Sequence, residues 1–260
     1  MESTVLQLST VSLMLCGVSL VIAGAVLIRS NGRLSDFLIV MGLLQLPAGT
    51  LIGTTLMGLA AVRPGRFDLY VNRFDGLFGY PSNYTAVLLA RYHLLRTVSV
   101  IDYHFYWVPL FIGLLFLAKI DVDQAWRGLL SCSLAGLTSI PLFMIFPVCG
   151  PLYALPNFPV VYTGPVHTQL IHSIPNCVPS VHFTMALFSL WFLRKSRTGI
   201  ALGSIHTALT ALATLGLGLH YIFDLFVAVP YAAAVLTLPS FAKQLYSRKE
   251  TKRLPKLETV

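Results

Sequence analysis

Long stretches of this chain carry no charge, and this absence limits the folds that it can adopt. From Gly128 to Leu193 there is no Asp, Glu, Lys or Arg, and between Thr198 and Ala242 the only charged residue is Asp224. Of the 260 residues, 56% are hydrophobic and 11% are charged. In a soluble domain roughly a quarter of the residues are charged, because its surface must interact with water. A disordered chain contains fewer apolar residues than this one. We therefore expect an all-α, polytopic bundle of membrane helices.

Seven apolar segments are candidates for membrane spans. About 20 apolar residues suffice for a helix to cross the roughly 30 Å of hydrocarbon, and the prolines of the neutral loop 148–178 divide the longest uncharged stretch. A further helix over 84–97 is expected to lie at the interface. Residues 1–242 are then one integral membrane domain, and 243–260 form a basic tail. The expected spans are 5–28, 37–62, 103–118, 128–147, 179–193, 199–217 and 220–240.

Basic residues indicate how the chain is oriented. With seven spans, 13 of the 18 Lys and Arg residues fall on one side, together with the C-terminal tail, so this side is expected to face the cytoplasm. Topology thus accounts for the net charge of +8, and no nucleic-acid partner is expected. The other five are arginines on the outer side, placed there either to anchor the chain at headgroups or to bind phosphate with their planar guanidinium groups. They are Arg63, Arg66, Arg73, Arg91 and Arg96.

Two histidines and one carboxylate are predicted to meet at the outer surface. Ser180 is a typical N-cap residue, and it places His182 in the first turn of a helix whose N-terminus favours an anion such as phosphate. His220 and Asp224 are four residues apart, so they share a helix face and can form a hydrogen bond. Because the chain between the histidines runs inward and back, both lie at one surface. One histidine, oriented by Asp224, can attack phosphorus, and the other can protonate the leaving oxygen.

These segments carry a family resemblance. Residues 177–182 (CVPSVH) and 218–224 (GLHYIFD) resemble the second and third motifs of the type 2 phosphatidic acid phosphatase superfamily. They look closest to its inositol phosphorylceramide synthase and sphingomyelin synthase branch. Residues 73–78 (RFDGLF) and 146–151 (FPVCGP) are similar to segments that precede the motifs in that branch. The resemblance covers about 73–240 and is strongest in the last third of the chain.

The resemblance implies a fold and a set of residue roles. It implies a six-helix phosphatase-like core and a phosphohistidine mechanism that needs no metal and no cofactor. His220 would be the nucleophile, Asp224 would orient it, and His182 would be the general acid. Ser180 and the backbone amides that follow it would hold the phosphate oxygens.

The chain also departs from the phosphatase pattern. Leu56 stands where the first motif has a lysine, and Ala213 and Thr214 replace the Ser-Arg pair of the third motif. The cations that bind phosphate must then come from elsewhere, and Arg91 and Arg96 are the first candidates. Arg63 and Arg73 are the next. These departures favour the transferase branch over plain phosphatases.

The sequence therefore predicts a membrane enzyme that acts on a phospholipid or lipid phosphate. An inositolphosphotransferase-like enzyme is favoured, with a lipid phosphatase that uses water as acceptor as the alternative. A transporter with a proton relay is the rival from another class. The expected location is a bacterial inner membrane, or the endoplasmic reticulum or Golgi of a eukaryote, with the site on the outer or luminal face. The lipid, the acceptor, the oligomeric state and a disulfide between Cys149 and Cys177 remain open.

Overall fold

The protein is mostly helical, as the absence of charge predicts. The computed structural model describes residues 17–26, 29, 36, 39–44, 65–171 and 173–253, with 242–253 as backbone only, and 75% of the structure is helix. Its little β-structure is one antiparallel pair, in which β1 (Gly65–Arg66) lies beside β2 (Gln169–Leu170). This pair ties the start of the described core to the neutral loop.

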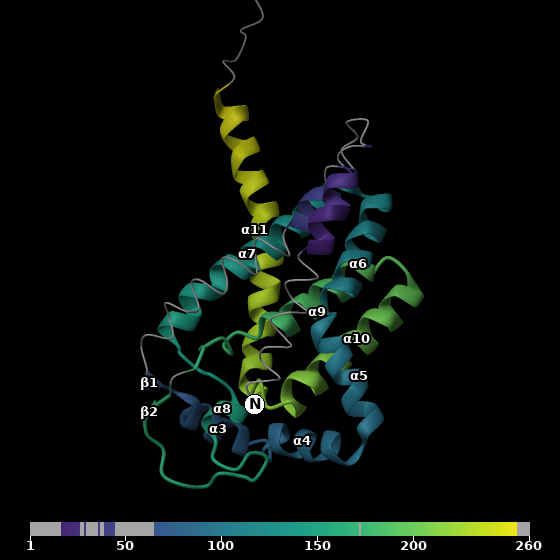
Figure 1. Cartoon of the computed structure of the whole chain (residues 1–260). Helices are drawn as coiled ribbons and strands as arrows, with labels where there is room; N and C mark the ends of the chain where they lie inside the picture. Colours follow the sequence, from purple (N-terminus) through teal and green to yellow (C-terminus); the bar gives the residue numbers. More distant parts are fainter. Residues whose placement is uncertain are drawn as a thin grey trace, which may run out of the picture.

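Nine labelled helices follow one another along the described chain from residue 65 onward. Three of them, α3, α4 and α8, gather at the end of the molecule opposite to that from which the end of α11 emerges (Figure 1). The helices are α3 (Asp68–Gly76), α4 (Pro81–Arg91), α5 (His93–His104), α6 (Trp107–Ile120), α7 (Val122–Ile145), α8 (Pro151–Ala154), α9 (Val181–Leu193), α10 (Arg197–Gly216) and α11 (Ile222–Arg253).

Within the described residues, three helices are long and apolar enough to cross a membrane: α7, α10 and Ile222–Phe241 of α11. A fourth candidate is the pair α5 and α6, which are bent by 56° relative to each other. The described part also has two shorter apolar helices, Gly17–Val26 and α9. These findings are compatible with an integral membrane protein, and the number of seven spans stays a prediction. The predicted spans 5–28 and 37–62 lie largely outside the described residues.

The prediction of one interfacial helix over 84–97 is wrong. The backbone is extended at Tyr92, with φ −114° and ψ 91°, so that α4 ends at Arg91 and α5 begins at His93. Both helices pack against α10, which gives their partly apolar faces a protein surface to cover. At the C-terminus, α11 continues as a helix to Arg253, past the boundary predicted at 242.

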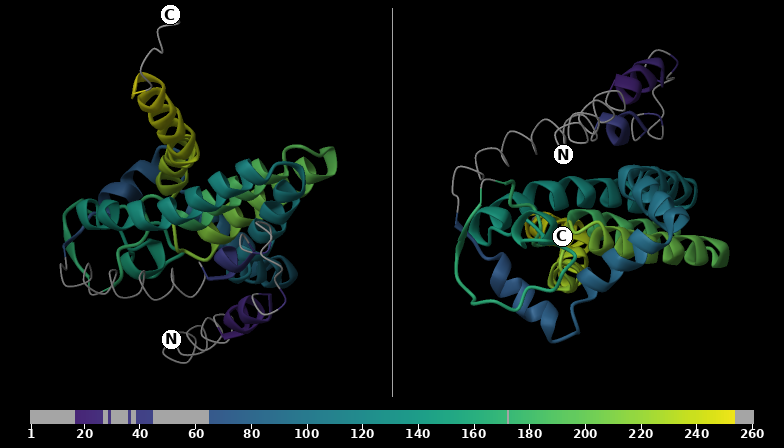
Figure 2. Two further views of the ribbon diagram at one scale, coloured as in Figure 1. Left: turned by 90° about the horizontal axis from the view of Figure 1, so that it is seen from above. Right: turned by 60° about the horizontal axis from the view of Figure 1, so that its bottom comes forward.

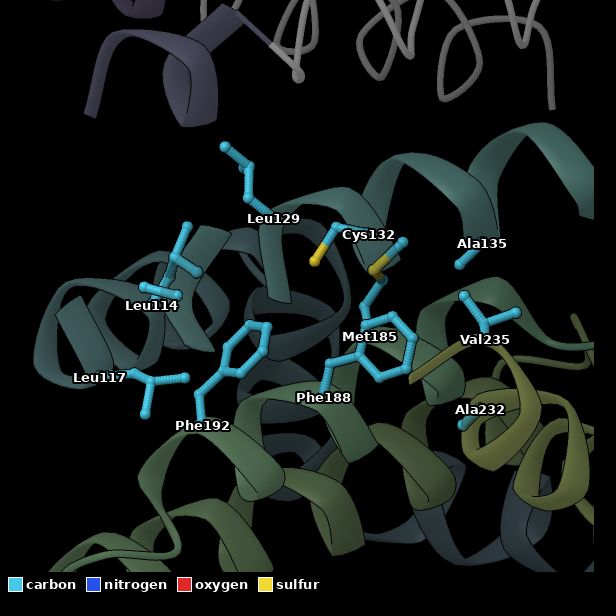
Figure 3. Packing of buried hydrophobic residues seen from close by; sticks show 11 residues of the cluster. Leu114, Leu117, Leu129, Cys132, Ala135, Met185, Phe188, Phe192, Ala232 and Val235 are labelled. Atoms are coloured by element: carbon cyan, nitrogen blue, oxygen red, sulfur yellow. The ribbon is translucent and has the colours of Figure 1, made fainter. Parts of the chain in front are cut away.

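The main core lies between α6, α7, α9 and α11. Figure 3 shows the rings of Phe188 and Phe192, from α9, among side chains of the neighbouring helices, including Leu114 and Cys132. A Cβ on Gly128 would lie 2.6 Å from the ring of Phe192, so this glycine allows α7 to approach α9 closely. The tight packing holds α9 in the centre of the bundle (Figure 2), and it thereby fixes the position of the N-terminus of α9.

Candidate active site

Three predicted residues, Ser180, His220 and Asp224, meet at the N-terminus of α9. Ser180 caps the helix, and its Oγ accepts a hydrogen bond from the backbone N–H of Phe183 at 3.4 Å, as predicted. His220 Nε2 lies 3.3 Å from Ser180 Oγ, and His220 Nδ1 lies 3.1 Å from Asp224 Oδ2. All three side chains are buried. The predicted pairing of His220 with Asp224 is therefore confirmed, and Ser180 completes a line of three polar groups.

The pairing arises differently from the prediction, because His220 precedes α11 and is not part of it. The chain reverses after α10 through Gly218, whose φ of +71° favours glycine. Asp224 Oδ2 also accepts the backbone N–H of Tyr221 at 2.8 Å, which closes the turn around the carboxylate. Burial lowers the pKa of His220 to about 4. The ring is thus uncharged at neutral pH and, with its Nδ1 proton directed at Asp224, keeps a lone pair on Nε2.

His182 lies two residues beyond Ser180, in the first turn of α9 as predicted. Its ring stacks on Tyr103, with centroids 4.1 Å apart, and meets the edge of Tyr106 at 4.7 Å. His220 contacts Ser180, which precedes His182 by two residues. The structure thus brings both histidines to one region, and an aromatic wall orients the second.

The candidate arginines do not meet the three polar groups. Arg73, Arg91 and Arg96 are exposed, and within the described residues none of them forms a hydrogen bond or ion pair with Ser180, His220 or Asp224. Arg63 lies outside the described residues. The guanidinium of Arg91 instead lies 5.8 Å from the ring centroid of Tyr92. Phosphate binding by these arginines stays a prediction.

Two carboxylates that sequence reasoning missed hold the His220 turn. Asp75 accepts the backbone N–H of Ile222, the first residue of α11, at 2.7 Å. Asp68 accepts the hydroxyl of Tyr221 at 3.2 Å, together with the backbone N–H groups of Cys149 at 3.0 Å and Gly150 at 2.8 Å. Burial raises the pKa of Asp68 to about 6. Their spacing of seven residues, which puts both on one face of a helix, was the signal in the sequence.

The two cysteines that bound the neutral loop are free, buried thiols, so the disulfide considered from the sequence is absent. Cys149 Sγ accepts a hydrogen bond from the buried guanidinium of Arg66 at 3.0 Å, whereas Cys177 Sγ donates to the carbonyl of Leu219 at 3.1 Å. Cys177 therefore braces the same turn as the carboxylates of α3.

Cys177 also belongs to a group of possible metal ligands. Ligand atoms of Cys177, His220 and Asp224 lie within 4.8 Å of one another. Sulfur and imidazole donors suit a soft ion such as zinc. An ion held there would occupy His220, and it would therefore compete with any chemistry at this histidine.

The family of the chain follows from comparison of its sequence with models of known families. A family model described as the PAP2 superfamily matches residues 71–238, and this range includes Ser180, His182, His220 and Asp224. The chain belongs to the PAP2 superfamily. PAP2 members are generally phosphatases, which supports an enzyme. No curated protein and no solved structure gives a significant match.

This PAP2 protein has a second His–Asp pair, between α5 and α10. His206 Nδ1 lies 2.7 Å from Asp102 Oδ1, and Thr210 Oγ1 donates to Asp102 Oδ2 at 2.7 Å. The side chain of His206 is 6% exposed, and its Nε2 has no partner among the described residues. Asp102 precedes Tyr103, the residue whose ring stacks on His182. The second pair thus lies close to the candidate active site.

Proposed function

We propose that this protein is an integral membrane lipid phosphotransferase or phosphatase that works through a phosphohistidine at His220. The observation that carries the proposal is the line Ser180–His220–Asp224, in which a buried, uncharged imidazole has its Nδ1 side held by a carboxylate. A carboxylate in this position keeps the proton of the imidazole on Nδ1, and Nε2 is then the nucleophilic atom. Membership of the PAP2 superfamily supports action on a lipid phosphoester.

The first step would transfer the phosphoryl group to the enzyme. The lone pair of His220 Nε2 forms a bond to phosphorus, and the bond from phosphorus to the leaving alcohol oxygen breaks. That oxygen takes a proton from His182, which acts as general acid in the protonated form that the bound phosphate anion favours. Ser180 Oγ, 3.3 Å from Nε2, and the free N–H groups at the start of α9 would hold the phosphate oxygens.

The second step would release the phosphoryl group to an acceptor. The acceptor hydroxyl gives its proton to His182, its oxygen bonds to phosphorus, and the bond from phosphorus to Nε2 breaks. Water as acceptor makes the protein a phosphatase, whereas an alcohol makes it a transferase. We favour a transferase related to inositol phosphorylceramide synthases, because Leu56, Ala213 and Thr214 depart from the phosphatase motifs.

The phosphate also needs cations, and the proposal takes them from the outer side of the membrane. Arg91 and Arg96 are the first candidates, followed by Arg63 and Arg73, because a guanidinium forms paired hydrogen bonds with phosphate oxygens. The three of these that the structure describes are exposed, so binding would require them to turn toward the substrate. The site would face the outside or the lumen, with the C-terminus in the cytoplasm.

Trapping the intermediate tests the proposal. Purified protein in detergent, with a chelator and no added metal, is mixed briefly with a lipid phosphate labelled at phosphorus. We expect a protein-bound label that is stable to alkali and labile to acid, as for a phosphohistidine. The label should be absent from His220→Ala and retained by His167→Ala, which replaces an exposed histidine of the neutral loop. An equal label in His220→Ala would contradict the proposal.

Product analysis separates phosphatase from transferase. The turnover reaction is run with and without an added lipid alcohol or polyol. A labelled product that contains the added alcohol indicates a transferase, whereas inorganic phosphate alone indicates a phosphatase.

A proton relay is the second candidate, since the pair His206–Asp102 adds a second ionisable group to the bundle. It would predict proton flux into liposomes that His206→Ala abolishes. Flux without lipid turnover would favour the relay over the enzyme.

A further inference from the structure

A polar cavity lies at the end of α9 away from the candidate active site. It has a volume of about 240 Å³, and Arg127, Ser131, Trp191, Arg194 and Ser240 are among the residues that line it. Ser180 is at the N-terminus of α9 and Arg194 directly follows its C-terminus. At 1.5 Å per residue, the 13 residues of this helix separate the two sites by about 20 Å. A phosphate group bound in the active site therefore does not reach this cavity.

One arginine of the cavity is held in a fixed orientation. The guanidinium of Arg194 lies 3.6 Å from the ring centroid of Trp191, a cation–π contact, and one amino group donates to Gln124 Oε1 at 2.9 Å. Gln124 is fixed in turn, because its side-chain amide donates to Asp121 Oδ2 at 2.6 Å. A guanidinium held in this way loses little conformational entropy when it binds an anion.

The second arginine has unused hydrogen-bond donors. Arg127 donates from Nε to the carbonyl of Asp123 at 3.2 Å, and its two terminal amino groups form no hydrogen bond within the described residues. The nearby carboxylate of Asp121 is occupied by the backbone and side chain of Gln124. The two terminal amino groups of Arg194 donate to the carbonyl of Trp191 and to Gln124, and each keeps a second N–H. Two guanidinium groups thus line one cavity with donors left for an anion between them.

We propose that this cavity binds the phosphate group of an anionic lipid headgroup, at a site separate from catalysis. Arg127 and Arg194 would each donate to phosphate oxygens, and the hydroxyl of Ser240 offers a further donor. The cavity lies where the apolar part of α11 ends, since the membrane-span candidate in this helix stops at Phe241. The basic residues Lys195 and Arg197 follow on the adjoining turn, so the local charge attracts anionic lipid.

Thermal unfolding tests this proposal without use of the active site. Protein in neutral detergent is titrated with phosphatidylglycerol, with phosphatidylcholine or with inorganic phosphate. We expect phosphatidylglycerol to raise Tm by about 5 °C, since a ligand that binds only the folded state stabilises it. Phosphatidylcholine should have little effect. The response should be lost in Arg194→Gln and Arg127→Gln.

The matched control is Lys195→Gln, which removes the same charge from the exposed neighbour of Arg194. It should respond like the unchanged protein, and Arg194→Lys, which keeps the charge and loses the planar fork, should respond weakly. A rise with inorganic phosphate alone would identify free phosphate as the ligand and overturn a lipid site. Equal responses to phosphatidylglycerol in Arg194→Gln, Arg127→Gln and Lys195→Gln would show a general charge effect and overturn the site altogether.

Discussion

The described part of the molecule contains two His–Asp pairs, and their surroundings differ more than their geometry. His220 and Asp224 lie 3.1 Å apart and His206 and Asp102 lie 2.7 Å apart, and in each pair the histidine uses Nδ1. The difference lies at Nε2. In His220 this atom faces Ser180 at the N-terminus of a helix, whereas in His206 it is buried and has no partner among the described residues.

The comparison shows that two His–Asp pairs of similar geometry can lie in different surroundings. His220 lies in a turn beside free backbone N–H groups of α9, where an anion can approach Nε2. His206 lies in the middle of α10, and Asp102 joins it to α5. The first pair is the one that we propose to react with a phosphate. The second is placed to hold α5 against α10, and thus Tyr103 against His182.

The largest expected effect on activity comes from replacing Asp224, and Asp102 of the second pair serves as its control. We expect Asp224→Asn to reduce kcat by about 1,000-fold, because Nδ1 of His220 loses the partner that sets its tautomer. Asp102→Asn should reduce kcat by less than about tenfold, because Asp102 acts only through packing. Initial rates with a labelled lipid phosphate, at matched amounts of folded protein, measure both. Equal losses in the two variants would break the distinction between the pairs.

The second pair should matter more for stability. We expect His206→Ala to lower the free energy of unfolding by about 3 kcal/mol, because it removes a buried side chain and leaves the mostly buried carboxylate of Asp102 without its imidazole partner. Unfolding by SDS titration measures the change. The control is the double variant Asp102→Leu with His206→Leu, which removes both polar groups and should recover most of the loss. If the double variant is as unstable as His206→Ala, the unpaired carboxylate is not the cause.

The turn of His220 also contacts two carboxylates of α3, Asp68 and Asp75. The pH dependence of stability tests Asp68. Burial raises the pKa of Asp68 from 3.8 to about 6 in the folded protein, so folding favours its protonated form. The stability that this provides is present below about pH 4 and is lost as the pH rises through about 6. A rise of about two pH units in pKa corresponds to about 3 kcal/mol.

We therefore expect Tm to fall between pH 4 and pH 7, and to fall less in Asp68→Asn, which does not titrate. Melting curves across this range, in one detergent, compare the two proteins. Asp68→Asn with the full pH dependence of the unchanged protein would show that Asp68 is not the titrating group.

Features that depend on neighbouring residues could be predicted from the sequence. The low charge predicts helices, Ser180 is a typical N-cap, and four residues separate His220 from Asp224. The N-cap follows a local rule for helix starts. His220 and Asp224 are also close in the chain, although they pair through the turn before α11 and not on one helix face. The same reasoning erred at Tyr92, where an apolar pattern that continues through the residue hides a break in the backbone.

Other features depended on how distant segments pack. Asp102 is 104 residues from His206, and Asp75 is 147 residues from Ile222. Helix packing brings such partners together, and no periodicity in the sequence indicates which residues will meet. The sequence by itself determined the helical class and the pairing of His220 with Asp224, since both depend on residues that lie close together in the chain. Only the tertiary structure decided that carboxylates of α3 hold the turn of His220 and that Asp102 pairs with His206. These contacts exist only once α3, α5 and α10 have packed.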